Sequence, residues 1–145
     1  MGNRLSDYNT GRSSNIQKKS LYTDLPLSFK DVHPNLKDLT ALRDIGAVKQ
    51  SVKNLILTNH NERPFQPDIG SNITGLLFEP ADVFTANAIK MEVLAVLARY
   101  EPRVADVTVQ IFDNSDRNAY QITIGFKIIY SEDPQEIDFY LQRLR

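Results

Sequence analysis

The sequence AYQITIGFKIIY at residues 119–130 decides the class of fold, because large apolar side chains alternate along it with polar or small ones. Successive side chains of a β-strand point to opposite faces of a sheet, so this period of two predicts a strand with one buried face. The residues expected on that face are Tyr120, Ile122, Ile124, Phe126, Ile128 and Tyr130. No other segment of the chain predicts a strand as clearly.

The segment before this strand predicts a second one. Val107, Val109 and Ile111 alternate with polar residues, which is again the pattern of a strand with one buried face. The polar run DNSDRN at residues 113–118 is typical of a turn between two strands. These two strands therefore start a predicted antiparallel meander.

The C-terminal segment carries signals for both a helix and a strand. Asp133 as a cap, Pro134 at the first helical position and Glu136 three residues after the cap favour a helix. Its apolar face would consist of Ile137, Tyr140, Leu141 and Leu144. A third strand of the meander would instead bury Ile137, Phe139 and Leu141. Both interpretations fit residues 134–144, and we favour the strand narrowly.

Two amphipathic helices are predicted before the sheet. The first follows Asp44, a candidate N-cap, and ends near Asn59. The second runs from about Thr85, its candidate cap, to Tyr100, and Pro102 ends it because the residue before a proline avoids helical angles. The first helix would bury Ile45, Val48, Val52, Leu55 and Ile56, and the second Ile89, Val93, Val96 and Tyr100. Between the two, Ser71 predicts the cap of a short helical turn that ends before Pro80.

This order of elements predicts an α+β fold, with two main helices packed on one face of a small antiparallel meander sheet at the C-terminal end. Residues 21–145 are expected to form a single domain, and residues 1–20 an extended polar and basic arm. Leu21–Phe29 contains Pro26 and predicts at most a short edge strand or an extended lead-in. A loop is expected around Pro34, Asn35 and Asp38.

Composition excludes several classes of protein. The chain has 145 residues, 41% of them hydrophobic, so it can close a core, and its net charge of −1 gives no global attraction to nucleic acid or to an anionic membrane. The absence of cysteine removes disulfides and thiolate chemistry. No apolar run reaches the ~18 residues of a membrane span, and the polar N-terminus does not resemble a secretory signal. We expect a soluble chain without cofactor, metal, nucleic-acid, membrane or small-molecule partner.

Few residues suggest catalysis. His33 and His60 lie in predicted loops without metal-ligand spacing. Carboxylates are the one route to an enzyme, since a glycosidase needs two of them roughly 5–10 Å apart with one kept protonated by apolar surroundings. The candidates in or beside predicted loops are Glu62, Asp68, Glu79 and Glu101. With 18 acidic residues in the chain, some pair converges in any fold of this size, so we do not expect an enzyme.

Two clusters point to docking on other proteins. The first is NERPFQPDIGS at residues 61–71, in which Pro64 and Pro67 stiffen the chain around Arg63 and Phe65, residue types enriched in interface cores. The second is YEPR at residues 100–103, where a proline just after the helix would hold a glutamate and an arginine on a rigid corner. An ordinary helix stop with an internal ion pair explains the second cluster equally well.

Read together, four segments resemble the baseplate wedge family of contractile-tailed phages, whose members are also called sheath initiators. The segments are LILT at 55–58, ERPFQPDIGS at 62–71, LFEP at 77–80 and YEPR at 100–103. The resemblance covers about residues 35–145 in the correct order, and the type VI secretion baseplate subunit is similar. Residues 1–20 match no motif of the family.

The resemblance implies a structural subunit that is present in several copies in the virion tail baseplate and is assembled in the host cytoplasm. It implies that Glu101, Pro102 and Arg103 contact the helical core bundle of the wedge, and that the sheet templates the first ring of tail sheath. Glu62, Arg63, Pro64 and Phe65 are expected to join this partner-binding surface. The family has also carried a lysozyme label, so a peptidoglycan hydrolase using a carboxylate pair is the alternative.

Overall fold

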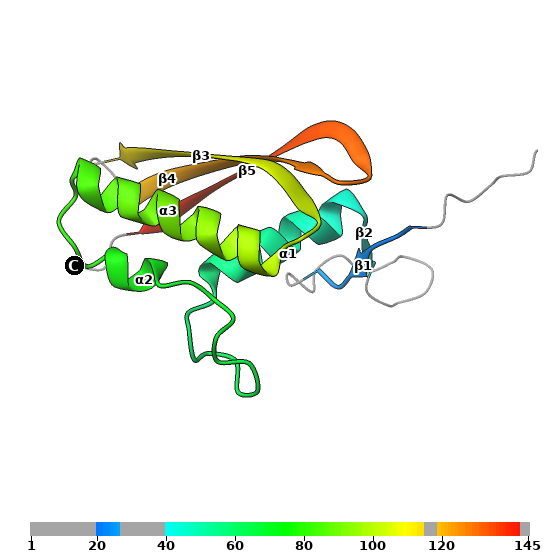
Figure 1. Ribbon diagram of the computed structural model, residues 1–145, viewed down its shortest axis with the longest axis horizontal. Coiled ribbons are helices and arrows are strands. Elements are labelled where there is room, and N and C mark those ends of the chain that lie inside the picture. Colours follow the sequence, from blue (N-terminus) through cyan, green and yellow to red (C-terminus); the bar gives the residue numbers. More distant parts are fainter. Residues whose placement is uncertain (1–19, 27–39, 115–118, 143–145) are drawn as a thin grey trace, which may run out of the picture.

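The computed structural model describes residues 20–26, 40–114 and 119–142, in which two long helices pack under a three-stranded sheet (Figure 1). The elements in chain order are β1 Thr23–Asp24, β2 Leu42–Arg43, α1 Ile45–Leu57, α2 Ile73–Leu76, α3 Val83–Tyr100, β3 Val104–Asn114, β4 Ala119–Ile128 and β5 Ser131–Gln142. This confirms the α+β prediction. None of the helices in the described ranges is long and apolar enough to cross a membrane.

The sheet is an antiparallel meander in the order β3-β4-β5. The alternation that predicts β4 is confirmed from Tyr120 to Ile128, since the five residues expected on the inner face are all buried. Tyr130 is an exception, with 74% of its surface exposed. That part of the prediction is wrong because β4 ends at Ile128, and Ile129 and Tyr130 form the turn into β5.

The strand interpretation of the C-terminal segment is confirmed over β5. Ile137 faces Ile124 in the register, and Phe139 and Leu141 are buried as the alternation predicts. Pro134 would start a helix in an isolated segment. It is tolerated in β5 because β5 is an edge strand of the described sheet, and a proline is compatible with an edge strand since it removes no N–H from the ladder when it faces outward.

Helix α1 buries the predicted face except for Ile45, which is 36% exposed at its first turn. Asp44 occupies the N-cap position, but its side chain makes no cap hydrogen bond to the helix. Its carboxylate instead accepts the backbone N–H groups of Leu21 and Tyr22 at 2.8 and 3.2 Å. The prediction of Asp44 as a capping side chain is therefore wrong, because a distant segment of the chain binds the same oxygen.

The N-cap of helix α3 lies three residues earlier than predicted. Asp82 is its N-cap and accepts the N–H of Thr85 at 2.7 Å, while the Thr85 hydroxyl donates to the carbonyl of Pro80. The hydrogen bond from the Thr85 backbone holds the pKa of Asp82 below its ordinary value. Thr85 thus lies in the first turn and is not the cap. Ile89, Val93 and Val96 face the core as predicted.

The short helix α2 begins at Ile73, two residues after Ser71, the predicted cap, and Asn72 occupies the N-cap position. Ser71 is buried, and its hydroxyl donates to the carbonyl of Ile56 at 2.7 Å and accepts the N–H of Ile73 at 3.4 Å. The hydroxyl therefore ties the start of α2 to the last turn of α1. Side chains from both long helices, α2 and the inner sheet face form one core.

An N-terminal strap, residues 20–26, crosses the start of α1 (Figure 1). Within it, β1 pairs antiparallel with β2, and the Gln50 side chain donates to the carbonyl of Leu25. This agrees with the predicted extended lead-in over the described part of Leu21–Phe29. The loop expected around Pro34 and the arm before Ser20 lie outside the described residues, so the domain boundary stays a prediction.

Candidate docking site

The corner formed by Glu101, Pro102 and Arg103 links the last turn of α3 to the first residue of β3. The N–H of Glu101 closes the helix on the carbonyl of Leu97 at 3.0 Å. The carbonyl of Arg103 accepts the N–H of Ile129, in the turn between β4 and β5, at 3.0 Å. The corner is therefore bound to the helix layer on one side and to the sheet on the other.

Glu101 points inward and is only 2% exposed. One of its carboxylate oxygens, Oε2, accepts hydrogen bonds from the Ser51 hydroxyl of α1 and from Nη2 of Arg103, both at 2.6 Å. The other, Oε1, accepts Nε of Arg103 at 2.5 Å. The expectation that the corner presents both charges outward is thus wrong for the glutamate, whose oxygens are engaged within the chain. The open alternative of an internal ion pair is what the structure has.

The protonation of Glu101 follows from these contacts. Burial acts to raise the pKa of its carboxyl, but the hydrogen bonds from Arg103 and Ser51 outweigh burial, so the pKa lies below its ordinary value. The carboxylate is ionised at neutral pH and acts as a fixed acceptor for the guanidinium. A general acid of a glycosidase needs the opposite shift.

Arg103 is the half-exposed member of the pair, with 30% of its side chain accessible. Its guanidinium carbon lies 5.1 Å from the centre of the Tyr22 ring, within the range of a cation–π contact. Glu101 accepts hydrogen bonds from two nitrogens of the guanidinium, in the bidentate geometry that suits arginine. The Tyr22 ring makes a second contact with the same group. The exposed charge of the corner is therefore that of Arg103, whose guanidinium is held by the carboxylate and by the ring.

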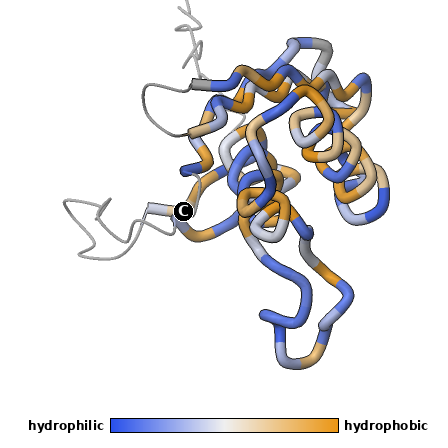
Figure 2. The backbone as a smooth tube through the Cα atoms, turned by 90° about the vertical axis from the view of Figure 1, so that its left-hand side faces the viewer, coloured by the Kyte–Doolittle hydropathy of each residue, from blue (hydrophilic) through white to orange (hydrophobic). Residues whose placement is uncertain are grey.

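The second predicted cluster lies on the loop between α1 and α2, which projects from the helix layer on the side away from the sheet and is mostly hydrophilic (Figures 1 and 2). Its base is closed by hydrogen bonds from Ser71 N–H to Thr58 carbonyl and from Asn61 N–H to Pro67 carbonyl, at 2.8 and 2.9 Å. The Tyr100 hydroxyl of α3 donates to the carbonyl of Asp68 at 2.6 Å. The loop is thus bound at its base and along its side.

Within this loop the predicted residues differ in role. Glu62 is exposed, but both of its carboxylate oxygens accept hydrogen bonds from Asn59, so it closes the turn. Phe65 is 97% exposed, and Arg63 and Pro64 are exposed as well. An aromatic ring fully in solvent on a proline-stiffened loop costs little entropy to bury, which suits an interface anchor.

An open groove of roughly 540 Å³ joins the two clusters, because Arg63 from the loop and the whole corner line it together. Its other lining residues are Asp24, Ser51, Asn54, Leu55, Ile69 and Tyr100. Glu62, Pro64 and Phe65 lie outside it. Sequence reasoning missed Tyr22, Asp24 and Ser51, and no local signal could have found them. Ser51, for example, meets Glu101 across 50 residues of sequence.

The carboxylates considered for catalysis do not form an acid–base pair of the required kind. Glu62, Asp68 and Glu79 are exposed, and Glu101 is buried as half of an ion pair. His60 lies 3.9 Å from Glu92, and no group of three potential metal ligands occurs within the described ranges. His33 lies outside those ranges. Among these candidate carboxylates, the buried one is therefore engaged by an arginine and the other three are exposed.

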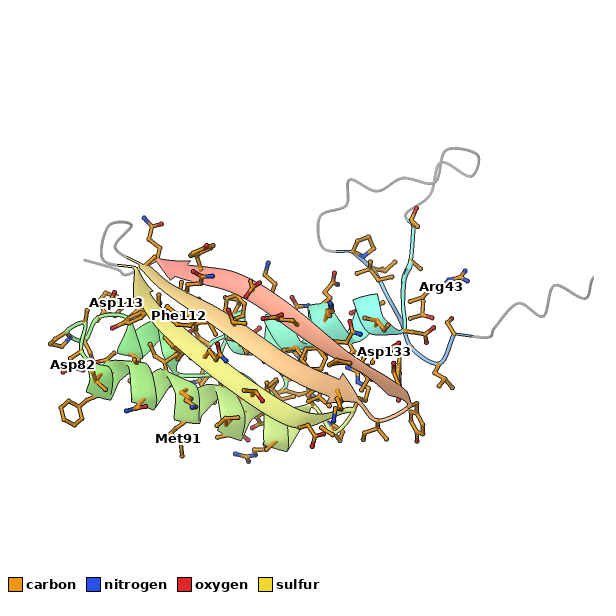
Figure 3. The ribbon with its side chains drawn as sticks, turned by 90° about the horizontal axis from the view of Figure 1, so that it is seen from above. Arg43, Asp82, Met91, Phe112, Asp113 and Asp133 are labelled. Atoms are coloured by element: carbon orange, nitrogen blue, oxygen red, sulfur yellow. The ribbon has the colours of Figure 1, made fainter. Side chains whose placement is uncertain are left out.

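The sheet offers a second surface. In Figure 3 the strands β3, β4 and β5 lie side by side over the helices, with Met91 on the outer side of α3. Phe112 and Tyr140 flank Gln121 in the register, so all three share the face away from the helices. The two aromatic side chains are 55% and 52% exposed. Within the described sheet, β3 and β5 pair only with β4, so each has one open edge.

Two helices packed on a three-stranded meander, with a corner bound to both layers and a projecting loop, form a small α+β domain. The chain belongs to the baseplate wedge protein gp25 family, whose model matches residues 43–133. It is therefore a structural subunit of the tail baseplate of contractile tail systems, as the resemblance implies.

One relative carries the family's name, and two solved structures share its fold. The chain is 25% identical over 115 residues to baseplate wedge protein gp25 of Enterobacteria phage T4, covering 76% of this chain and 86% of that protein. A Geobacter sulfurreducens protein with a proposed tail-lysozyme role has the same fold, with a TM-score of 0.63 at 20% identity over 68% of this chain and 89% of its own. A chain of the type VI secretion baseplate complex gives a TM-score of 0.53 at 18% identity, over 66% of this chain and 91% of its own.

Proposed function

We propose that this baseplate subunit docks on the helical core of the wedge through the groove between the corner and the loop, and that its sheet templates the first ring of sheath. The observation that carries the first half is the convergence of the two clusters on one groove. Each cluster is recognisable separately in the sequence, but only the fold brings Arg63 and Arg103 to the lining of one groove.

The groove favours a partner that presents carboxylates. Arg103 keeps its positive charge and part of its surface, although Glu101 neutralises it locally, and Arg63, which is exposed on the loop, lines the same groove. Leu55, Ile69 and Tyr100 supply apolar surface between the two. A helix with an acidic and an apolar stripe meets both requirements, and such helices form bundles. Phe65 would anchor the same partner beside the groove.

In this arrangement Glu101 acts on Arg103 and does not touch the partner. Its two oxygens fix the guanidinium plane before binding, so less rotamer entropy is lost when the complex forms. Pro102 is exposed and fixes the backbone between the two. In the proposal, Arg103 contacts the partner, Glu101 orients Arg103, and Pro102 fixes the backbone between them.

The second half of the proposal rests on the sheet. An extended segment of a sheath subunit can continue the ladder at the outer edge of β3 or of β5. Side chains at alternate positions of that segment would contact the outer face, where Phe112 and Tyr140 are exposed. The sheet would in this way offer the first ring a ready-made pairing edge.

Arg63→Glu tests the docking groove. Arg63 makes no side-chain hydrogen bond among the described contacts, so the fold should persist, while a reversed charge on the groove wall should weaken binding of an acidic helix at least tenfold. The measurement is co-purification and titration with the co-expressed wedge-core subunits of the same tail. Arg43→Glu, an exposed arginine on β2 (Figure 3), is the matched control and should bind normally. Normal binding by Arg63→Glu would sink the groove proposal.

The same proposal excludes hydrolysis of peptidoglycan. We expect purified protein to release no reducing sugar from peptidoglycan between pH 4 and 8, because the one buried carboxylate among the candidates is held ionised by Arg103. A known lysozyme in the same assay is the control. Turnover that disappears in Glu101→Gln would establish the enzymatic alternative instead.

A further inference from the structure

The N-terminal strap, residues 20–26, is bound to the start of α1 by a dense set of contacts. Asp44 accepts the N–H groups of Leu21 and Tyr22 with its carboxylate and donates its own N–H to the Tyr22 carbonyl at 2.8 Å. The pairing of β1 with β2 and the bond from Gln50 to Leu25 continue the attachment. The backbone around Tyr22 is thereby fixed on both sides.

The strap brings Tyr22 to the corner and Asp24 to the docking groove. The ring of Tyr22 lies against the Arg103 guanidinium, 5.1 Å from ring centre to guanidinium carbon, and Asp24 lines the groove itself. Both residues precede residue 43, where the match to the family model begins. The contacts that the strap makes with the corner and the groove therefore come from outside the residues that the family model matches.

We propose that the strap is part of the docking site, with Tyr22 as the positioning residue that holds Arg103 against its glutamate and Asp24 as an acidic wall that selects the partner. This inference rests on the proposed function, because it assumes that Arg103 meets the wedge core. It adds a requirement on the partner, which must place a cation or a hydrogen-bond donor opposite Asp24 and its carboxylates opposite the arginines.

The physical reason lies in the freedom of the arginine. The Glu101 carboxylate accepts hydrogen bonds from Nε and Nη2, along one edge of the guanidinium, and does not cover its two flat faces. An aromatic ring over one face restricts the tilt of the plane and attracts the cation through its quadrupole. With the strap in place, Arg103 keeps one face and its remaining N–H groups for the partner.

Two substitutions of Tyr22 separate the ring from the rest of the side chain. Tyr22→Phe keeps the ring and should bind the co-expressed wedge-core subunits as the wild type does. Tyr22→Leu keeps an apolar side chain without the quadrupole and should bind about fivefold more weakly. Met91→Ala, on the outer side of α3 and 66% exposed, removes an apolar side chain away from the groove and is the control that should bind normally.

A spectroscopic readout reports on the same contact without a partner. In the free protein, the Nε–H resonance of Arg103 should be slow to exchange and shifted upfield by the ring current of Tyr22. The shift should persist in Tyr22→Phe and disappear in Tyr22→Leu. Arg43, which is exposed, supplies the reference signal of a freely solvated arginine.

The outcomes distinguish this inference from the proposed function. If Tyr22→Leu binds normally while Arg63→Glu binds weakly, the groove docks the partner but the strap has no part in it, and the inference is overturned. If Tyr22→Phe is as weak as Tyr22→Leu, the ring does not position Arg103, and the inference is overturned as well. An Arg103 signal as mobile as that of Arg43 in the wild type also overturns it, even if Tyr22→Leu does not fold. If Arg63→Glu binds normally too, the proposed function itself fails.

Discussion

Arg103→Ala is expected to lower the free energy of unfolding by about 3 kcal/mol at pH 7, because it leaves a buried carboxylate without its ion-pair partner. Glu101 is 2% exposed, and after the substitution the Ser51 hydroxyl is the remaining side-chain donor to it among the described contacts. Chemical denaturation followed by circular dichroism measures the change. Docking on the wedge core should be lost as well, since the exposed cation of the corner is gone.

The pH dependence of the two proteins should have opposite signs. In the wild type the pKa of Glu101 is below its ordinary value of 4.5, so the pair stabilises the fold above that value and this contribution is lost as pH falls through the lowered pKa. In Arg103→Ala, burial dominates and raises the pKa of Glu101. The variant should therefore regain part of its stability when pH is lowered from 7 towards 5, where the carboxyl takes up a proton in the folded state.

Arg43→Ala is the control for this pair of measurements, because Arg43 is exposed on β2 (Figure 3). A surface substitution of this kind should change the free energy of unfolding by less than about 0.5 kcal/mol. Equal losses in the two variants, or an Arg103→Ala protein that gains no stability between pH 7 and 5, would contradict the ion-pair account.

Gly70→Ala is expected to destabilise the protein by about 3 kcal/mol and to open the loop between α1 and α2. Gly70 has a φ of 142°, which side chains of L-residues rarely adopt. An added Cβ would also lie 2.7 Å from the carbonyl oxygen of Thr58 and 2.8 Å from that of Asn59, both rigid backbone atoms. The hydrogen bond from Ser71 N–H to Thr58 carbonyl should break, and amide hydrogen exchange at Ser71 measures that directly.

Gly46→Ala is the matched control with the opposite sign. Gly46 lies in the first turn of α1, and an added Cβ would meet the Leu42 side chain at an ordinary contact distance of 3.6 Å. Alanine has the higher helix propensity, so the free energy of unfolding should rise by up to about 0.5 kcal/mol. A Gly70→Ala protein as stable as Gly46→Ala would show that the loop tolerates rearrangement at its base.

Local patterns predicted most of the fold because burial enforces them along each element. The alternation in β4 identified its buried face, and the period of the helices identified Val48, Val52 and Ile89. The errors occur where a distant group competes with a local one. Asp44 is a good cap by composition, but the strap takes its carboxylate. The residues around Pro134 favour the start of a helix locally, but the segment forms β5 because it can hydrogen-bond to the backbone of β4.

The sequence predicted which residues form the corner, but it did not predict which of their side chains point inward and which are exposed. Proline and residue type marked the YEPR corner, whereas the inward turn of Glu101 depends on Ser51 from another helix. Tyr22 and Asp24 had no marker at all, because a single tyrosine or aspartate in an extended segment is common. Only the packing of the strap on α1 brings them to Arg103.

The bond between the Arg103 carbonyl and the Ile129 N–H has a mechanical meaning. Strand β3 starts at the residue after Arg103, so the corner is continuous with one strand and hydrogen-bonded to the turn that joins the other two. Tension applied to the sheet along its strands would load the β3–β4 ladder in shear, with many hydrogen bonds resisting together. The same tension would reach the end of α3 through Pro102 over a path of a few peptide bonds. If the sheet binds sheath and the corner binds the wedge core, as proposed, a pull on the sheet would be delivered to the corner with little elastic loss.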